Sequence, residues 1–489
     1  MNKNRKIKNL IIAAVIVFFL GLAAGVGLML LISGHTKKET VEEEEETTSE
    51  NEIGDTSAVI VESPDTDIVI AKESALEGKD TITGSYDLYF KSCDWGTQLL
   101  RVVLELDAPI DEANPEDWVV KEKKKGWQDE SSDKKITDAF LCDDEGNRTE
   151  EPSSHVVLEL YTAPEEMTPY VFNEDDLHYE YPEKYEVKVG LADDVDLTSM
   201  GIEVKDLTMD DEYSDYHTGV DRYSFDSFEA SDGIEYNYAH YEAKNSSGDP
   251  ADTLIVYLHG LNEGGTDNTD AKLMAQLQNT AIFLGDDFQN AMGGASILMP
   301  QCPTYWMNQM PDYGEMEFAV INPYIQSWYT GSLHELITAY KAQCGASRVV
   351  IAGFSNGGFM SLMLALTYET EYDGYVCLSE AMWDKSMTDE HITNLAKLPI
   401  YFVYCNADNT APPADYGAST ASRIAAKKPK RLHVAALDSI LDISNTYYNA
   451  DGTQYRFDDH QTEIYFFRNG VTCGSCGLSL WEFMAKVGR

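Results

Sequence analysis

Basic residues are scarce in this sequence of 489 residues: 36 lysines and arginines stand against 84 aspartates and glutamates, for a formal net charge of −48. Such a field repels phosphate groups, which argues against nucleic acid as a partner and against binding of the bulk of the protein to an anionic membrane surface. Eight cysteines are too few for a disulfide-dense scaffold, and 16 prolines and 34 glycines exclude a collagen-like or proline-rich chain.

Cofactor motifs are missing as well. The sequence contains no phosphate-binding loop, no G-x-G-x-x-G motif and no metal-binding motif, so we expect neither a cofactor nor a metal. Cys473 and Cys476 form a C-x-x-C pair without a second cysteine pair or a strand–helix redox setting, which indicates a local disulfide or two idle thiols. The composition is otherwise globular, and at roughly 150 residues per domain the length predicts two to four units.

Long hydrophobic runs are absent except for one near the start. Residues 10–32 are 23 consecutive apolar or small residues, and a bilayer core needs about 20 residues of helix. Basic residues precede this run, which predicts a cytoplasmic tail at 1–9 and an extracellular location for the rest. The alternative is a cleaved signal peptide, but the run exceeds the roughly 7–15 residues of such a region and no clear A-x-A site follows. We therefore expect an uncleaved signal anchor in the lipid bilayer of the cell membrane.

An acidic segment follows the hydrophobic run. Residues 39–66 contain eleven acids and no base, with threonine, serine and asparagine between them. Such a composition cannot bury a core and its charges repel one another, so we expect a disordered linker over 33–83.

Short strand-like runs fill residues 84–207. The stretches 102–106 and 156–160 both read VVLEL and alternate between residues that face a core and residues that do not. Many short strands between turn-rich acidic stretches predict a β-sandwich. Nothing in this region looks catalytic, so we expect it to support the next domain rather than to hold a ligand.

Strands alternate with helices in residues 208–489. A β-hairpin is predicted over 225–242, and helices over 332–343 and 356–368. Six short apolar runs fit a parallel sheet: 254–258, 296–299, 349–352, 375–378, 400–404 and 433–437. This alternation predicts an α/β domain with helices on both faces of a parallel sheet.

The sequence GFSNG at 353–357 fits the G-x-S-x-G pattern. It follows a predicted strand directly and precedes a predicted helix, and its glycines permit the sharp turn that exposes the hydroxyl of Ser355. In this strand–turn–helix setting the motif predicts that Ser355 is a nucleophile.

A serine nucleophile of this architecture needs an acid and then a base further along the chain. His460 lies in a polar loop before the predicted last helix, 478–487, and is the expected base. His391 comes before the strand 400–404, which is too early, and His433 lies inside a predicted strand.

The acid should follow the strand 400–404. Asp408 stands just past that strand and is the expected acid. Asp415, which we expect inside the following helix, and Asp384, after the preceding strand, are the alternatives.

The oxyanion of an acyl transfer needs two backbone N–H groups. One is expected from Asn356, directly after the nucleophile. The other is expected from Leu261, in the glycine-rich loop after strand 254–258, with Gly260 and Asn262 as alternatives. His259 is expected to shape this loop rather than to transfer protons.

Five stretches carry a family resemblance: LHGLNEGGTDN, MPQCPTYWMNQ, GFSNGGFM, CNADNTAPP and DDHQTEIYFF. Over about 213–489 the chain resembles the α/β-hydrolase superfamily, and in detail bacterial secreted proteins described as prolyl-oligopeptidase-like or as esterases related to polyhydroxybutyrate depolymerases and feruloyl esterases. Some of that group carry an immunoglobulin-like module in front, which implies such a fold for 84–207. The resemblance implies the same roles for Ser355, Asp408, His460, Leu261 and Asn356.

The resemblance also concerns the substrate pocket. It implies that Trp306, in the loop after strand 296–299, lines this pocket, although a packed loop aromatic is the alternative reading. Relatives often have an aromatic residue directly after the base, whereas here it is Gln461. The longest piece without predicted structure, 301–323, is expected to roof an open cleft.

These features lead to a functional expectation. The chain is expected to be a membrane-anchored extracellular serine hydrolase that cleaves carboxylic esters, either small or polymer-borne, through an acyl-enzyme. A serine peptidase of the prolyl-oligopeptidase type and a non-catalytic cell-surface binding protein are the alternatives. The absence of a preceding β-propeller argues against the peptidase, and the complete set of triad residues argues against the binding protein.

Overall fold

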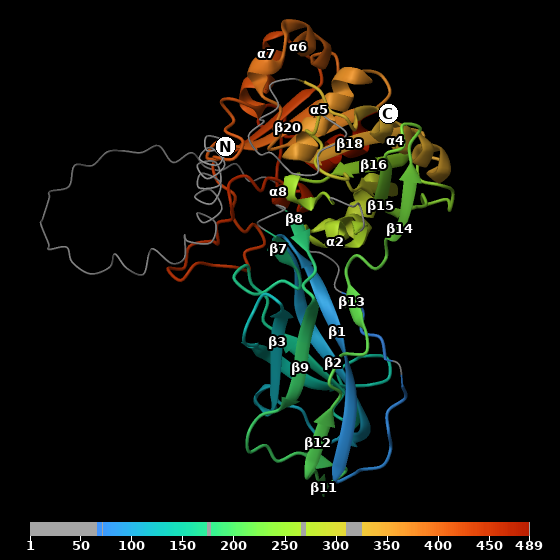
Figure 1. The fold of residues 1–489 in the computed structure, drawn as a ribbon, viewed down its shortest axis with the longest axis vertical. Coiled ribbons are helices and arrows are strands. Elements are labelled where there is room, and N and C mark those ends of the chain that lie inside the picture. Colours follow the sequence, from blue (N-terminus) through green and yellow to red (C-terminus); the bar gives the residue numbers. More distant parts are fainter. Residues whose placement is uncertain (1–65, 71, 174–177, 266–269, 310–324, 489) are drawn as a thin grey trace, which may run out of the picture. The chain divides into compact units, whose positions relative to one another are not determined.

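The computed structural model describes residues 66–70, 72–173, 178–265, 270–309 and 325–488 (Figure 1). The chain divides into two compact units, and the second, which comprises residues 56–316 and 322–489, contains every element described below. The predicted anchor at 10–32 and most of the predicted linker lie outside the described residues. Within the described ranges, no helix combines the length and apolar character that crossing a bilayer requires.

Residues 81–218 form a β-sandwich. Its larger sheet has the strand order β12-β1-β2-β6-β5, with β13 also paired to β1, and its smaller sheet has the order β4-β3-β9. The strands are β1 (Thr81–Cys93), β2 (Gly96–Ile110), β3 (Trp118–Lys125), β4 (Ser132–Lys134), β5 (Ile136–Cys142), β6 (Ser153–Leu160), β7 (Val171–Asn173), β8 (His178–Glu180), β9 (Lys184–Leu191), β10 (Thr198–Ser199), β11 (Ile202–Glu203), β12 (Asp206–Met209) and β13 (Tyr216–Thr218).

The sandwich core lies between these two sheets. Leu88 and Val102 of the larger sheet pack in one cluster with Val120 and Val187 of the smaller sheet, as the period-two alternation predicts. The opposite face of the larger sheet is buried too, and Tyr89, Val103 and Val157 pack there against Ile68 and Ile70. The stretch 66–70 and 72–80, named here the strap, therefore covers that face.

The sandwich begins before the expected boundary of 84 and ends after the expected boundary of 207. The strap lies within the expected linker 33–83 but bonds to the sandwich, for example through Ser74 N–H to Asp144 Oδ1 at 2.8 Å and Lys79 N–H to Ser199 Oγ at 3.0 Å. At the other end, β13 still pairs with β1, so the chain leaves the sandwich only after Thr218. A local sequence pattern does not reveal the strap or β13 as parts of the sandwich, because their partners lie far away in the sequence.

The rest of the chain forms an eight-stranded sheet of order β14-β15-β17-β16-β18-β19-β20-β21. The first two strands and β17 pair antiparallel, and all later pairs are parallel. The strands are β14 (Ser224–Glu229), β15 (Glu235–Tyr241), β16 (Thr253–Leu258), β17 (Ala295–Pro300), β18 (Arg348–Phe354), β19 (Gly374–Leu378), β20 (Ile400–Cys405) and β21 (Leu432–Leu437). The expected hairpin and all six expected parallel strands are present, preceded by the β-sandwich, so the predicted α/β architecture is confirmed.

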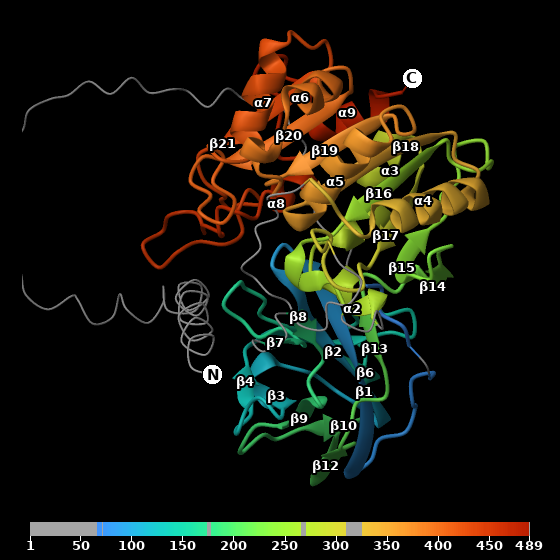
Figure 2. The ribbon, with the colours of Figure 1, turned by 45° about the horizontal axis from the view of Figure 1, so that its top comes forward.

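Helices cover both faces of this sheet (Figures 1 and 2). Alternate residues of the strands enter two different cores: Leu254 and Val256 pack with α4–α7, whereas Ile255 and Tyr257 pack with α2, α3, α8 and α9. The helices are α2 (Ala271–Gln276), α3 (Asp286–Met292), α4 (Thr330–Cys344), α5 (Asn356–Thr367), α6 (Asp389–Leu395), α7 (Gly417–Ala426), α8 (Glu463–Phe467) and α9 (Leu480–Lys486).

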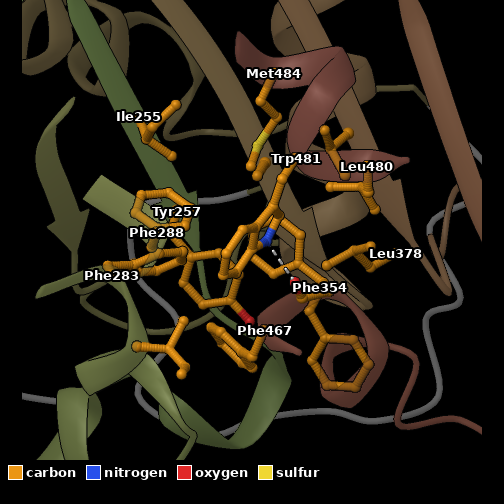
Figure 3. Packing of buried hydrophobic residues seen from close by; sticks show 14 of the residues in the cluster. Ile255, Tyr257, Phe283, Phe288, Phe354, Leu378, Phe467, Leu480, Trp481 and Met484 are labelled. Atoms are coloured by element: carbon orange, nitrogen blue, oxygen red, sulfur yellow. Dashed lines mark hydrogen bonds between the residues drawn. The ribbon is translucent and has the colours of Figure 1, made fainter. Parts of the chain in front are cut away.

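The second core is rich in aromatic rings (Figure 3). The ring centroids of Tyr257, Phe283 and Phe467 lie within 6 Å of one another. The Trp481 indole N–H donates to the carbonyl of Phe466 at 2.9 Å. Helix α8 was not expected from the sequence, where a polar loop was predicted to run to the last helix. This packing joins the segment that follows His460 to the centre of the sheet.

Candidate active site

Ser355 lies at the turn between β18 and α5, with backbone angles φ 53° and ψ −111°. A non-glycine residue pays about 1–3 kcal/mol for such a conformation, so the surroundings must enforce it. The backbone of Ser355 is held on both sides, since its N–H donates to Leu378 O at 2.8 Å and its carbonyl accepts from Phe359 N–H at 3.0 Å. The turn thereby presents the hydroxyl at the carboxyl end of the sheet.

The glycines around Ser355 are required by close contacts rather than by backbone angles. A Cβ at Gly353 would lie 2.2 Å from Gly357 O, and a Cβ at Gly357 would lie 2.0 Å from Leu258 O. Helix α5 therefore starts directly against β16 and β18, which no larger residue at these two positions permits. The sequence motif and the observed geometry agree for this reason.

The structure brings the three expected triad residues together. His460 Nε2 lies 2.8 Å from Ser355 Oγ, and His460 Nδ1 lies 2.8 Å from Asp408 Oδ2. The second carboxylate oxygen, Asp408 Oδ1, accepts the N–H groups of Thr410 and Ala411 at 2.8 and 2.9 Å. This carboxylate is therefore fixed in orientation, and the imidazole bridges it to the hydroxyl.

Asp408 remains ionised in this setting. Burial alone would raise the pKa of Asp408, but the hydrogen bond and charge of His460, together with the N–H groups of Ala411 and Thr410, outweigh it and lower the pKa below its ordinary value. A carboxylate held by donors on both oxygens can orient the Nδ1–H of His460 and stabilise its protonated form.

The alternative acids and bases lie in other surroundings. Asp415 precedes α7, outside the helix in which it was expected, and pairs with Lys385 at 3.0 Å, while Asp384 pairs with Arg423 at 3.0 Å. His433 lies in β21 beside Cys476, and the backbone of His391 is bonded to Thr388 at the start of α6. None of these four side chains has a contact with Ser355 or His460 among the interactions of the described residues.

The expected oxyanion loop follows β16. Leu261 begins a short 3₁₀ turn, Leu261–Glu263, and Asn356 is the first residue of α5, where the helix leaves its leading N–H groups without intrahelical acceptors. A Cβ at Gly260 would lie 3.2 Å from the ring of Phe354, so the loop packs directly against the turn that carries the nucleophile.

The half-buried Glu263 and the buried His259 fix the oxyanion loop. Glu263 Oε2 accepts the N–H of Gly260 at 2.8 Å, and its Oε1 accepts Gln278 Nε2 at 2.7 Å. Burial raises the pKa of Glu263 to about 7, against the opposing effect of these donors. His259 Nε2 accepts the N–H of Cys302, so Nδ1 carries the proton and donates to Gly260 O at 2.6 Å. Burial lowers the pKa of His259 to about 4, which leaves it neutral and consistent with a shaping role.

Trp306 does not form the wall of a pocket. Its side chain is fully buried, its indole N–H donates to His259 O at 3.2 Å, and its backbone N–H donates to Asn356 Oδ1 at 2.6 Å. These contacts support the oxyanion loop and the start of α5 from behind, in place of the substrate contact that the family resemblance implied. Part of the expected roof, 310–323, lies outside the described residues.

A contact between the β1–β2 hairpin of the sandwich and the loop of the base was not expected. Trp95 stacks on Phe457, three residues before His460, with ring centroids 6.1 Å apart and an interplanar angle of 22°. Asp94 receives a buried hydrogen bond from Arg468 at 2.5 Å and another from Asn279 at 2.9 Å. Contacts between residues so far apart in sequence leave no local pattern that could have revealed them.

Two parts of the chain match known protein families. Residues 239–432 match the phospholipase/carboxylesterase family, and residues 85–202 match the esterase Ig-like N-terminal domain family. Ser355 and Asp408 lie inside the first match, and His460 lies beyond its end. No curated protein sequence matches the chain.

Solved structures resemble the chain in fold. A thermostable esterase superposes with a TM-score of 0.59 at 18% identity, over 78% of this chain and 96% of that chain. Est1E from Butyrivibrio proteoclasticus has a TM-score of 0.29 at 13% identity, over 43% of this chain and 88% of that chain. The first similarity spans both the sandwich and the sheet, and it is a similarity of fold.

The sheet, the strained serine and the family match together define a serine hydrolase. More particularly, residues 239–432 of its catalytic domain match the phospholipase/carboxylesterase family, and the domain in front of it matches the esterase Ig-like N-terminal domain family.

Proposed function

We propose that this protein is a membrane-anchored extracellular esterase in which Ser355, His460 and Asp408 cleave carboxylic esters through an acyl-enzyme. One observation carries the proposal. A single imidazole lies 2.8 Å from the hydroxyl of a serine held at φ 53° and 2.8 Å from an ionised carboxylate. This is the geometry of a nucleophile, its general base and the acid that orients the base.

The first chemical step forms the acyl-enzyme. Ser355 Oγ attacks the ester carbonyl carbon while its proton moves to His460 Nε2, and the carbonyl electron pair moves to the oxygen. Collapse of the tetrahedral intermediate breaks the bond to the alcohol oxygen, which takes the proton from His460. Asp408 holds the Nδ1–H throughout and stabilises the imidazolium that forms. Water then repeats the sequence and releases the acid.

The oxyanion of the intermediate needs preorganised donors. The N–H groups of Leu261 and Asn356 are proposed to supply them, and the N-terminus of the twelve-residue helix α5 adds the positive end of its dipole. Glu263 and His259 support this arrangement from behind, because both bond to Gly260, directly before Leu261.

The cellular location is proposed from the sequence alone. The 23-residue apolar run at 10–32 and the basic residues before it support a signal anchor with the catalytic domain outside the cell. Protease added to intact cells should release an active fragment by cutting between the run and the strap. Protection in intact cells, with cleavage only after lysis, would show that the orientation is wrong.

Covalent labelling tests the nucleophile. A fluorophosphonate should add to Ser355, as located by peptide mass spectrometry, and Ser355→Ala should lower kcat by about 10³–10⁶-fold. A folded wild-type protein that neither reacts with the probe nor hydrolyses esters would favour the non-catalytic binding protein.

A substrate panel tests the reaction class. Aryl esters, acetylated or feruloylated sugars and short peptides should be compared by kcat/KM with the same enzyme preparation. We expect turnover of one or more ester groups and little cleavage of peptides, because only the ester expectation agrees with the matched family. Preferential cleavage of peptides would support the peptidase alternative.

A further inference from the structure

A second cluster of reactive side chains lies at the edge of the catalytic sheet. Strand β21 is the last strand of that sheet, and its His433 faces the turn Cys473–Cys476. The donor atoms of His433, Cys473 and Cys476 all lie within 4.8 Å of one another, and His433 Nδ1 lies 3.4 Å from Cys476 Sγ. The fold thus supplies the third ligand that the isolated C-x-x-C pair lacks in the sequence.

One of these separations is close to the value for a tetrahedral metal site, and all of them lie within 4.8 Å. In such a zinc site, Zn–S bonds of about 2.3 Å and Zn–N bonds of about 2.0 Å place a sulfur and a nitrogen ligand roughly 3.5 Å apart, and two sulfur ligands roughly 3.8 Å apart. The 3.4 Å between His433 Nδ1 and Cys476 Sγ is already close to the first value.

The backbone prepares the turn for this arrangement. Cys473 O accepts the N–H groups of Cys476 and Gly477 at 3.3 and 2.8 Å, and Gly477 adopts φ 70°, which favours glycine. The N–H of Gly474 donates to Val434 O at 3.0 Å and so attaches the turn to β21 next to His433. Both cysteines and the histidine are therefore placed before any ion arrives.

The imidazole ligand is held in place by a neighbouring aromatic ring. The ring of His433 is oriented by Tyr401, on which it stacks with centroids 5.7 Å apart.

We propose that His433, Cys473 and Cys476 bind Zn²⁺, with the fourth position open to solvent beside the exposed Cys476. Two thiolates and an imidazole select zinc over Mg²⁺ or Ca²⁺, which prefer oxygen ligands. The ion would link the turn before α9 to the edge strand of the sheet, and no triad residue takes part.

Cobalt substitution tests this site directly. The full-length protein is reduced, treated with a chelator and titrated with Co²⁺ under argon. We expect a thiolate-to-cobalt charge-transfer band in the near ultraviolet and the d–d bands of tetrahedral Co²⁺, both removed by added Zn²⁺. Cys476→Ser should abolish these bands, and His433→Gln should weaken them. Cys344→Ser, which removes a thiol from α4, is the matched control and should leave them unchanged.

Thermal unfolding supplies a second readout. Zn²⁺ should raise the Tm of the wild type and of Cys344→Ser but not of Cys476→Ser, because only a bound ion stabilises the folded state. Turnover of a small ester should be the same with and without Zn²⁺, so a failure of this site is distinguishable from a failure of the proposed catalysis. The proposal is overturned if the reduced wild type gives no thiolate–cobalt bands, if Cys476→Ser gives the same bands, or if protein isolated without added oxidant contains a Cys473–Cys476 disulfide.

Discussion

The turn of Ser355 and the loop of His460 meet at one reaction centre but are held in different ways. Contacts of the turn come from the flanking strands and from glycines within a few residues, such as Gly357 against Leu258 O. The loop of His460 depends on distant partners: Trp95 of the sandwich packs against Phe457, and Ile440 N–H donates to Asp459 at 3.2 Å. The nucleophile is thus positioned by its glycine motif and the neighbouring strands of the sheet, and the base is positioned by segments outside the sheet.

This difference has a consequence for the role of the sandwich. The region contributes no triad residue, as expected, yet its β1–β2 hairpin lies against the loop that carries the base. The sandwich therefore supports the loop of the base, and it also contacts the segment around α2, for example through Thr97 Oγ1, which donates to Gln276 O at 3.0 Å. Four changes test how far the two halves of the site depend on different parts of the molecule.

The largest effect is expected from Asp408→Asn, which acts on the base. An amide at this position favours the wrong tautomer of His460, and kcat should fall by around 10⁴-fold while the fold persists. Steady-state kinetics with a small aryl ester and circular dichroism measure the two effects. Asp415→Asn is the matched control. Asp415 pairs with Lys385, so this substitution should leave kcat nearly unchanged. Strong loss in the control, with activity kept in Asp408→Asn, would reassign the acid.

A smaller effect is expected from Gly357→Ala, which acts on the turn. The new Cβ would lie 2.0 Å from Leu258 O, so β16 and the start of α5 must separate. Overpacking of this kind costs about 1–3 kcal/mol of stability, and a shift near 1 Å at the nucleophile can cost about 10²-fold in kcat. Urea unfolding measures the loss of stability, and the rate of fluorophosphonate labelling measures the effect on the nucleophile. Gly331→Ala in α4, where an added Cβ meets nothing within 4 Å, should change neither.

The features that the sequence predicts are those that depend on nearby residues. The turn, the triad and all strands of the catalytic sheet were predictable, because spacing and alternation encode them locally. Trp306 was expected to contact substrate but is buried against His259 and Asn356. The hydrogen bond between Glu263 and Gln278 and the contact of Trp95 were not predictable either, because both depend on which separate segments pack together.

An effect smaller than that of Gly357→Ala is expected from Trp95→Ala, which leaves the triad itself intact. Loss of the stacked indole should loosen Phe457 and the loop of His460, and kcat should fall roughly tenfold, less than the 10²-fold that a displacement of about 1 Å can cost. Trp127→Ala, which removes an exposed tryptophan from the same sandwich, is the control for general effects on that region. Equal kinetics for wild type and Trp95→Ala would show that the hairpin does not position the base.

The smallest effect on catalysis is expected from Glu380→Gln, whose consequence is for stability. Glu380 lies under the start of α5, and burial raises its pKa to about 8, against the donation of Met382 N–H at 2.6 Å. The folded state therefore keeps a proton that the unfolded state loses above about pH 4.5. The stabilisation from this proton is complete below that pH and is lost as the pH rises through about 8.

Urea unfolding between pH 5 and 9 measures this loss. The free energy of unfolding of the wild type should fall with pH more steeply than that of Glu380→Gln, by up to about 1.4 kcal/mol per pH unit for one proton. Glu390→Gln, an exposed position on α6, should leave the slope as in the wild type. Identical slopes for wild type and Glu380→Gln would refute the assignment.

The strap has a mechanical consequence. Its Val69 and Ala75 N–H groups bond to Tyr89 Oη at 2.8 Å and Ser154 Oγ at 3.1 Å, and its isoleucines close one face of the sandwich. If residues 10–32 tether the chain to a membrane, a pull on that tether reaches the strap first. Its bonds, spread over several strands, would share the load in shear before any force reached the loop of His460. The sandwich would then protect the catalytic domain from force on the tether.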